Sequence, residues 1–181
     1  MTAMHPLTFN DLGCLPMGRH VVTMEEARSY SGLPDPSHRQ ALWDDFETLT
    51  SQVRGAVGRV PACWLGGSYF TDKTQPGDID VVYLLDYEDV VACDDEAKKF
   101  LNFLRGKRVK TYLGLQIDGF FIPWWPASGP GAGSADRGVH YLQSRGYWDD
   151  LWSRLRDDEP LVDGLPRRGY LEVIVDGYER P

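Results

Sequence analysis

One stretch of the chain, CWLGGSYFTDKTQPGDIDVVYLL, combines a glycine-rich turn with two closely spaced carboxylates. Gly66, Gly67 and Ser68 follow a short apolar run, and Asp78 and Asp80 begin a second one. Alternate residues of a strand lie on one face about 7 Å apart, so the two aspartates repel each other unless a cation lies between them. Such hard oxygen ligands suit Mg²⁺, and a glycine-rich turn presents backbone N–H groups that suit phosphate oxygens. The pattern indicates a site for a metal and a phosphorylated substrate.

A third carboxylate, Asp118, lies within the apolar sequence LQIDGFFI. An unpaired carboxylate in a strand that enters a core is costly, so its presence calls for a partner. If this strand lies beside the one that carries Asp78 and Asp80, the three carboxylates meet. Two Mg²⁺ ions about 4 Å apart could then contact both the attacking and the leaving oxygen of a phosphoryl transfer.

The order and spacing of these residues resemble the nucleotidyltransferase superfamily related to DNA polymerase β. Its signature is an apolar strand that ends in Gly-Ser, a spacer, two acidic residues separated by one residue, and a third acidic residue on a later strand. Here the spacer between Ser68 and Asp78 has nine residues. The resemblance covers about residues 38–122, and the whole chain also looks like small prokaryotic and phage nucleotidyltransferase-like proteins of unassigned function.

The resemblance implies a role for each of these residues. Asp78 and Asp80 would ligate the metal ion that holds the triphosphate. Asp118 would help to hold the second metal ion and would lower the pKa of the attacking hydroxyl. Gly67 and Ser68 would bind the β- and γ-phosphates.

Several other features have two interpretations each. Lys73 reaches a phosphate from the segment before the acidic pair, or it is a solvated loop lysine. The basic cluster of Lys107, Arg108 and Lys110 guides a nucleotide or an acceptor, or it is a charged turn between a helix and a strand. The Trp pair at 124–125 stacks on a base, or it anchors the core. The sequence GPGAGS imitates a nucleotide-binding loop but has no lysine, which favours a plain loop.

Hydrophobic patterning predicts the elements that position these residues. Capping boxes at Thr23–Glu26 and Ser37–Gln40 each open a helix, the second of them at about 38–54. A later helix runs from Asp94 or Asp95 to Gly106, and another extends from about 139 to 155 with a break near Gly146. Strands are predicted at 60–65, 79–85, 109–122 and 170–175, and Glu172 is assigned to an outward position.

This order of elements predicts an α+β fold in which helices flank a mixed sheet, and the resemblance implies the polymerase β-like nucleotidyltransferase fold. A single domain is expected over residues 1–181, with a core at about 38–122 and additional helices and strands at both ends. No apolar run approaches the roughly 20 residues that a membrane span needs. Three cysteines without a CxxC motif favour reduced thiols and a cytoplasmic location.

The sequence therefore predicts a Mg²⁺-dependent enzyme that moves a nucleoside monophosphate from an NTP to an acceptor hydroxyl. The acceptor is a small molecule, a protein or an RNA end, and the formal charge of −8 favours a cationic small molecule or a protein over RNA. Small relatives in the superfamily belong to toxin–antitoxin or phage-defence systems. The alternative is a non-catalytic interaction module, such as an antitoxin-like partner, although such a module has no need for three carboxylates.

Overall fold

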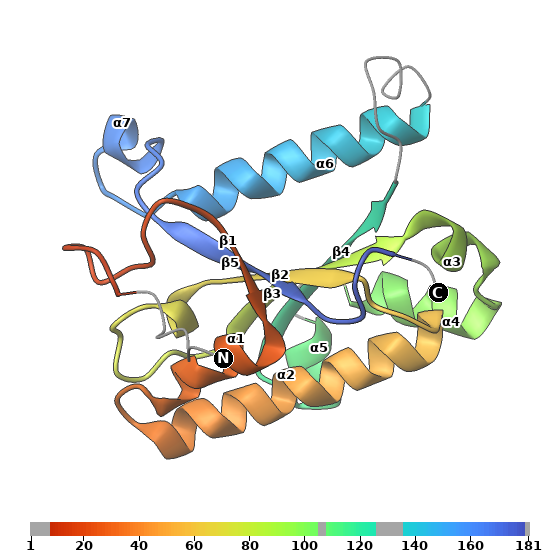
Figure 1. Cartoon of the computed structure of the whole chain (residues 1–181), viewed down its shortest axis with the longest axis horizontal. Coiled ribbons are helices and arrows are strands. Elements are labelled where there is room, and N and C mark those ends of the chain that lie inside the picture. The colour runs from red at the N-terminus through yellow and green to blue at the C-terminus, as the bar shows by residue number, and fades with distance from the viewer. Residues whose placement is uncertain (1–7, 105–107, 126–135, 180–181) are drawn as a thin grey trace.

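The computed structural model of the chain describes residues 8–104, 108–125 and 136–179. Five strands form one sheet in the order β1-β5-β2-β3-β4 (Figure 1). The strands are β1 (Gly18–Thr23), β2 (Ala62–Gly66), β3 (Ile79–Asp86), β4 (Ile117–Trp124) and β5 (Gly169–Ile174). The pairs β1–β5 and β3–β4 are parallel, whereas β2 is antiparallel to both of its neighbours. The predicted α+β fold with a mixed sheet is confirmed.

Helices cover both faces of the sheet (Figure 1). They are α1 (Met24–Arg28), α2 (Pro36–Val57), α3 (Tyr87–Ala92), α4 (Asp95–Phe103), α5 (Arg108–Leu113), α6 (Asp136–Ser153) and α7 (Pro160–Asp163), with short 3-10 turns η1 (Ser29–Gly32) and η2 (Ser68–Phe70). The long helix α2 lies under one face, where Phe46 and Leu49 pack with Leu65 and Val81. On the opposite face, α6 contributes Trp152 to a second apolar cluster. Since successive side chains of a strand alternate between the two faces, the sheet supplies both clusters.

Helix α2 begins before the predicted capping box. Its N-cap is Asp35, whose carboxylate accepts a hydrogen bond from the backbone N–H of His38 at 3.4 Å. Pro36 occupies the first helical position, where a missing N–H costs nothing. The Ser37 hydroxyl donates to Asp35 instead of capping the helix. The capping box at Thr23 is confirmed, because both of its reciprocal hydrogen bonds are present.

The predicted strand at 109–122 is wrong in its first half. Residues Arg108–Leu113 form α5, and β4 begins only at Ile117. The β-branched and aromatic residues of this segment favour a strand, but burial of Val109 in the core from a helical position overrides that propensity. The helix brings Lys110 to the start of β4, which a continuous strand would not do.

One further prediction needs correction, and one strand was not predicted. Helix α6 runs through Gly146 without a break. A glycine costs about 1 kcal/mol in a helix interior, and the packing of Tyr141 and Trp152 against the sheet offsets that cost. The sequence also gave no indication of β1, whose exposed edge carries little apolar alternation and whose partner, β5, is distant along the chain. Gly106 and the GPGAGS sequence lie outside the described residues.

In the described part of the chain, none of the helices has the length and apolar character that crossing a bilayer requires. Cys14 and Cys63 are buried free thiols, and Cys93 is a partly buried one.

Candidate functional site

The register of the sheet brings the predicted carboxylates together. Asp80 on β3 pairs with Asp118 on the parallel strand β4, so both lie at the same end of adjacent strands. Asp78 comes two residues before Asp80, directly ahead of β3. The other neighbour of β3 is β2, whose last residue, Gly66, pairs with Asp80. The glycine-rich turn and all three aspartates therefore meet at one end of the sheet, as the sequence predicts.

Gly67 allows this turn to lie against Asp80. Its backbone has φ +76° and ψ −168°, a region that essentially only glycine adopts. A Cβ atom at this position would overlap the Asp80 carboxylate. Gly66 has a similar role toward α6, because a Cβ atom there would come within 3.0 Å of the Trp152 ring. Ser68 follows directly and opens η2.

Replacing Gly67 by alanine is therefore expected to destabilise the protein and displace Asp80. The strained backbone alone costs about 1–3 kcal/mol, and the overlap with Asp80 adds to it. For a chain of this size the melting temperature is expected to fall by at least about 2 °C. Gly77→Ala is the matched control, because nothing lies within 4 Å of its Cβ position. Equal melting temperatures for both variants in thermal denaturation would contradict this role of Gly67.

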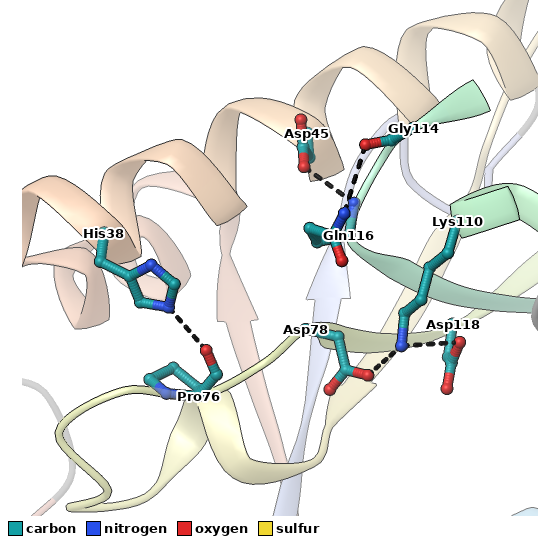
Figure 2. A network of polar contacts seen from close by, with 8 residues as sticks. All are labelled: His38, Asp45, Pro76, Asp78, Lys110, Gly114, Gln116 and Asp118. Carbon is teal, nitrogen blue, oxygen red and sulfur yellow. Dashed lines mark hydrogen bonds and ion pairs between the residues drawn. The ribbon is translucent and has the colours of Figure 1, made fainter.

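The Lys110 ammonium lies between two of the aspartates (Figure 2). It donates a hydrogen bond to Asp78 and lies 3.1 Å from Oδ1 of Asp118. These side chains are only 18–25% exposed. Burial lowers the pKa of Lys110, but the hydrogen bond to Asp78 and the negative charges of both aspartates outweigh it and raise that pKa overall. Within the basic cluster predicted from the sequence, Lys110 faces the site, Arg108 is exposed, and Lys107 lies outside the described residues.

The aspartates fit a divalent cation by their chemistry, since carboxylate oxygens are the ligands that Mg²⁺ prefers. Oδ1 of Asp118 is buried and accepts no hydrogen bond from any described residue, although the ammonium is 3.1 Å away. Such a buried oxygen needs a positive charge beside it, which the Lys110 ammonium supplies. Among the described residues, no three carboxylate, imidazole or thiolate side chains are placed so that they could hold a metal ion together. An ion bound by all three aspartates would need the Lys110 ammonium to move.

Asp80 lies in an unfavourable position for a negative charge. Burial raises its pKa, and the negative charges of Asp78 and Asp118 raise it further, from 3.8 to about 6. The positive charges of Arg168 and Lys110 lower this pKa, but by less. A carboxylate that is costly to ionise in the free protein gains the most when a metal cation binds beside it.

Helix α2 positions the segments that lead into both acidic positions (Figure 2). His38 bonds through Nε2 to the carbonyl of Pro76 at 2.6 Å, two residues before Asp78. Asp45 accepts a hydrogen bond from the backbone N–H of Gln116 at 2.8 Å, two residues before Asp118. His38 and Asp45 are seven residues apart, which is about two helical turns, so they lie on the same face of α2. A single rigid helix therefore sets the spacing between the two parts of the site.

The segment between the glycine-rich turn and the acidic pair is fixed by Arg39, which the sequence analysis did not identify. Arg39 is fully buried and donates to the carbonyls of Tyr69, Thr71 and Lys73, and to that of Pro34. Its guanidinium also lies over the Tyr69 ring. The signal in the sequence is a cation placed three residues before Leu42, on the apolar face of the helix.

For Lys73 and the Trp pair at 124–125, the structure favours one of the two interpretations. Lys73 is exposed and contributes its carbonyl to Arg39, which matches a solvated loop lysine. The rings of Trp124 and Trp125 pack on Tyr178 and Tyr87, which favours an anchoring role.

Arg168, a further residue that the sequence analysis did not identify, directly precedes β5. Its Nε donates to the carbonyl of Trp152 at 2.9 Å, and its charge acts on Asp80. Nothing in the local sequence RRGYLEVIV indicates this position, because it depends on the pairing of β5 with β2. Arg168 adds a positive charge to the end of the sheet that holds the glycine-rich turn.

The assignment of Glu172 to an outward position is wrong. Its side chain is buried and accepts hydrogen bonds from Trp64 at 3.1 Å and from Tyr178 at 2.6 Å. It also forms an ion pair with Arg19 at 3.0 Å. The alternating pattern places Glu172 on the face opposite Leu171 and Val173, and α6 covers that face, so the carboxylate is enclosed rather than solvated.

Comparison with known proteins identifies the chain at the level of a family. The model of a family described as being of unknown function (DUF6932) matches residues 7–174. No curated protein and no solved structure gives a significant match. The family match spans all five strands and the three aspartates. The chain therefore belongs to the DUF6932 family.

Proposed function

We propose that this protein is a Mg²⁺-dependent nucleotidyltransferase that moves a nucleoside monophosphate from an NTP to an acceptor hydroxyl. The observation that carries this proposal is the meeting of Asp78, Asp80 and Asp118 with the Gly66–Ser68 turn at one end of the sheet. Three carboxylates beside a glycine-rich turn are a costly arrangement for stability alone. They suit a substrate that arrives with its own phosphates and a metal ion.

Each part of the site has a role in this reaction. Asp78 and Asp80 would hold Mg²⁺, which when bound would supply neutralisation of the charge on the transferring phosphoryl group. The turn and the Ser68 hydroxyl bind the β- and γ-phosphates through N–H and O–H donors. Asp118 lies on the side from which the acceptor enters and takes the proton of its hydroxyl. Catalysis then consists of positioning and charge neutralisation, as is usual for phosphoryl transfer.

The bonds change in a single displacement. The acceptor oxygen forms a bond to the α-phosphorus, while the bond from that phosphorus to the bridging oxygen of the β-phosphate breaks. The electron pair of the broken bond leaves with pyrophosphate, and the hydroxyl proton passes to Asp118. The formal charge of −8 on the chain favours a cationic small molecule or a protein as the acceptor over RNA. A toxin–antitoxin or phage-defence setting is consistent with such an acceptor.

The proposal is tested by label transfer. Cell extract is incubated with the protein, Mg²⁺ and each NTP labelled at the α-phosphate, and small molecules, proteins and RNA are separated. We expect one class to gain label with the parent protein and no class to gain label with Asp80→Asn. If the parent transfers no label and binds no NTP in the presence of Mg²⁺, the chain is instead a non-catalytic interaction module.

Ser68→Ala is expected to weaken NTP binding moderately and to leave the fold unchanged. The variant loses one hydroxyl donor, while the backbone N–H groups of the turn remain, so the loss is about 1–2 kcal/mol, or roughly 5–30-fold in Kd. Calorimetry with a non-hydrolysable NTP and Mg²⁺ measures this difference. Ser51→Ala, on the exposed side of α2, is the matched control. An unchanged Kd for Ser68→Ala would show that the turn is only structural.

A further inference from the structure

We propose that Lys110 is a built-in cation on the acceptor side of the site, so that the site takes one divalent metal ion with its nucleotide rather than two. The inference rests on the proposed function, because it names the cations of that same site. It begins from the two ion pairs of Lys110, which join Asp78 and Asp118 across neighbouring strands (Figure 2). A two-metal site would place a divalent ion between these same carboxylates.

Lys110 is held in this position by the structure around it. It belongs to α5, which packs on β4, and the preceding residue, Val109, is buried in the core. The hydrogen bond from the Gln116 N–H to Asp45 fixes the segment that joins α5 to β4. The Lys110 side chain is only 23% exposed. A lysine on a flexible surface loop would leave when a metal ion arrives, whereas one on an anchored helix next to its partners is retained.

The remaining ligands define a place for one divalent ion. Lys110 contacts Oδ2 of Asp78 and Oδ1 of Asp118, which leaves Oδ1 of Asp78 available on the other side. Within the described residues, Asp80 makes no side-chain hydrogen bond or ion pair that would compete with a metal. Its carboxylate lies against Gly67 and therefore next to the turn that would bind phosphates. Asp78 and Asp80 would therefore hold the divalent ion beside the glycine-rich turn.

Charge balance agrees with this arrangement. The three aspartates carry three negative charges, and Lys110 and Arg168 carry one positive charge each, which leaves one negative charge. One divalent ion more than compensates it before the nucleotide brings its own charge. Two divalent ions together with the retained ammonium would place three cations among three carboxylates, with strong mutual repulsion at short distance.

The test counts metal ions with Mn²⁺ as the probe. Protein is dialysed to equilibrium against Mn²⁺ and an α,β-methylene NTP, and bound metal and bound nucleotide are both measured. The parent is expected to hold one Mn²⁺ per bound nucleotide. Lys110→Met removes the ammonium and is expected to hold two. Lys99→Met, an exposed lysine on α4, is the matched control and is expected to hold one, as is Lys110→Arg.

Melting curves in a chelator give a second measurement that needs no nucleotide. Lys110→Met is expected to melt several degrees below the parent, because Asp78 and Asp118 lose their counter-ion, while Lys99→Met is expected to melt with the parent. Two Mn²⁺ per nucleotide in the parent, or one in a folded Lys110→Met, would overturn the role of Lys110 and leave the proposed function intact. If the parent binds no Mn²⁺ with the nucleotide, the proposed function fails and this inference fails with it.

Discussion

Asp80→Asn is expected to melt at the same temperature as the parent, or higher, when a chelator is present. The substitution keeps the shape of the side chain and removes one of three neighbouring negative charges. Excess Mg²⁺ is expected to stabilise the parent by mass action, by about 2.7 kcal/mol at one hundred times Kd, and to leave the variant nearly unchanged. Transfer of the nucleoside monophosphate is expected to fall by several orders of magnitude, because the variant no longer holds the metal ion that would bind the triphosphate.

The pH dependence of this difference follows from the pKa of Asp80. In the folded protein this pKa is raised from 3.8 to about 6, by burial and then by the charges of Asp78 and Asp118. Between about pH 4 and pH 6 the folded state therefore binds more protons than the unfolded chain, so the stability contributed by this group falls as pH rises. The advantage of Asp80→Asn over the parent in chelator is expected to grow through this window and to stay constant above it.

Thermal denaturation with chelator at several pH values tests both parts of this expectation. A repeat with excess Mg²⁺ at neutral pH completes the comparison. If Asp80→Asn melts several degrees below the parent in chelator, the carboxylate is a structural group that caps the glycine-rich turn, and the metal site is wrongly assigned.

Arg39→Met is expected to be among the most destabilising single substitutions in the chain. Arg39 is fully buried and donates to four backbone carbonyls, three of them in the segment 69–73. Methionine fills a similar volume but leaves these carbonyls without donors. Charge-assisted hydrogen bonds contribute about 1.5–3 kcal/mol each, so a loss of at least about 3 kcal/mol is expected. The corresponding fall in melting temperature is about 6–12 °C.

The same substitution is expected to weaken NTP binding in whatever fraction remains folded, because the released segment begins next to Ser68. Arg39→Lys is expected to recover little, since one ammonium cannot reach carbonyls spread over several residues as the guanidinium fork does. Arg28→Met is the control, because Arg28 is exposed and forms a surface ion pair with Glu47. A melting temperature for Arg39→Met equal to that of Arg28→Met would show that water satisfies these carbonyls.

The interpretation of the sequence was most accurate where local pattern and burial agree. Strands β2 and β3 were predicted to within two residues at each end, because they are short apolar runs bounded by turn residues. The apolar stripe of α2 was predicted because Leu42, Phe46, Leu49 and Val53 recur at helical spacing. The segment around Lys110 was predicted wrongly because its side chains fit a strand or a helix, and only its tertiary contacts distinguish them.

The burial and the partners of individual polar side chains depended on tertiary contacts that no local sequence pattern indicates. Glu172 alternates with apolar neighbours as a solvated residue would, yet α6 covers its face of the sheet and Trp64 and Tyr178 bind it. Arg168 lies near Asp80 only because β5, from the end of the chain, inserts between β1 and β2. The periodicity of apolar residues does not indicate which strands pair when more than one hundred residues separate them.

By itself, the sequence determined the types of the site residues and their order along the chain. The glycines before Ser68, the Asp-Ile-Asp pair and the isolated Asp118 are all visible there, because a turn without Cβ atoms and a carboxylate in an apolar run are local departures from ordinary patterns. Only the tertiary structure decided that β4 lies parallel to β3 with Asp118 opposite Asp80, and that a short helix brings the Lys110 ammonium between Asp78 and Asp118. The physical reason is that packing between distant segments sets the strand register and the direction of a long side chain. The free energy of that packing depends on both segments together, so no single segment of the sequence reveals it.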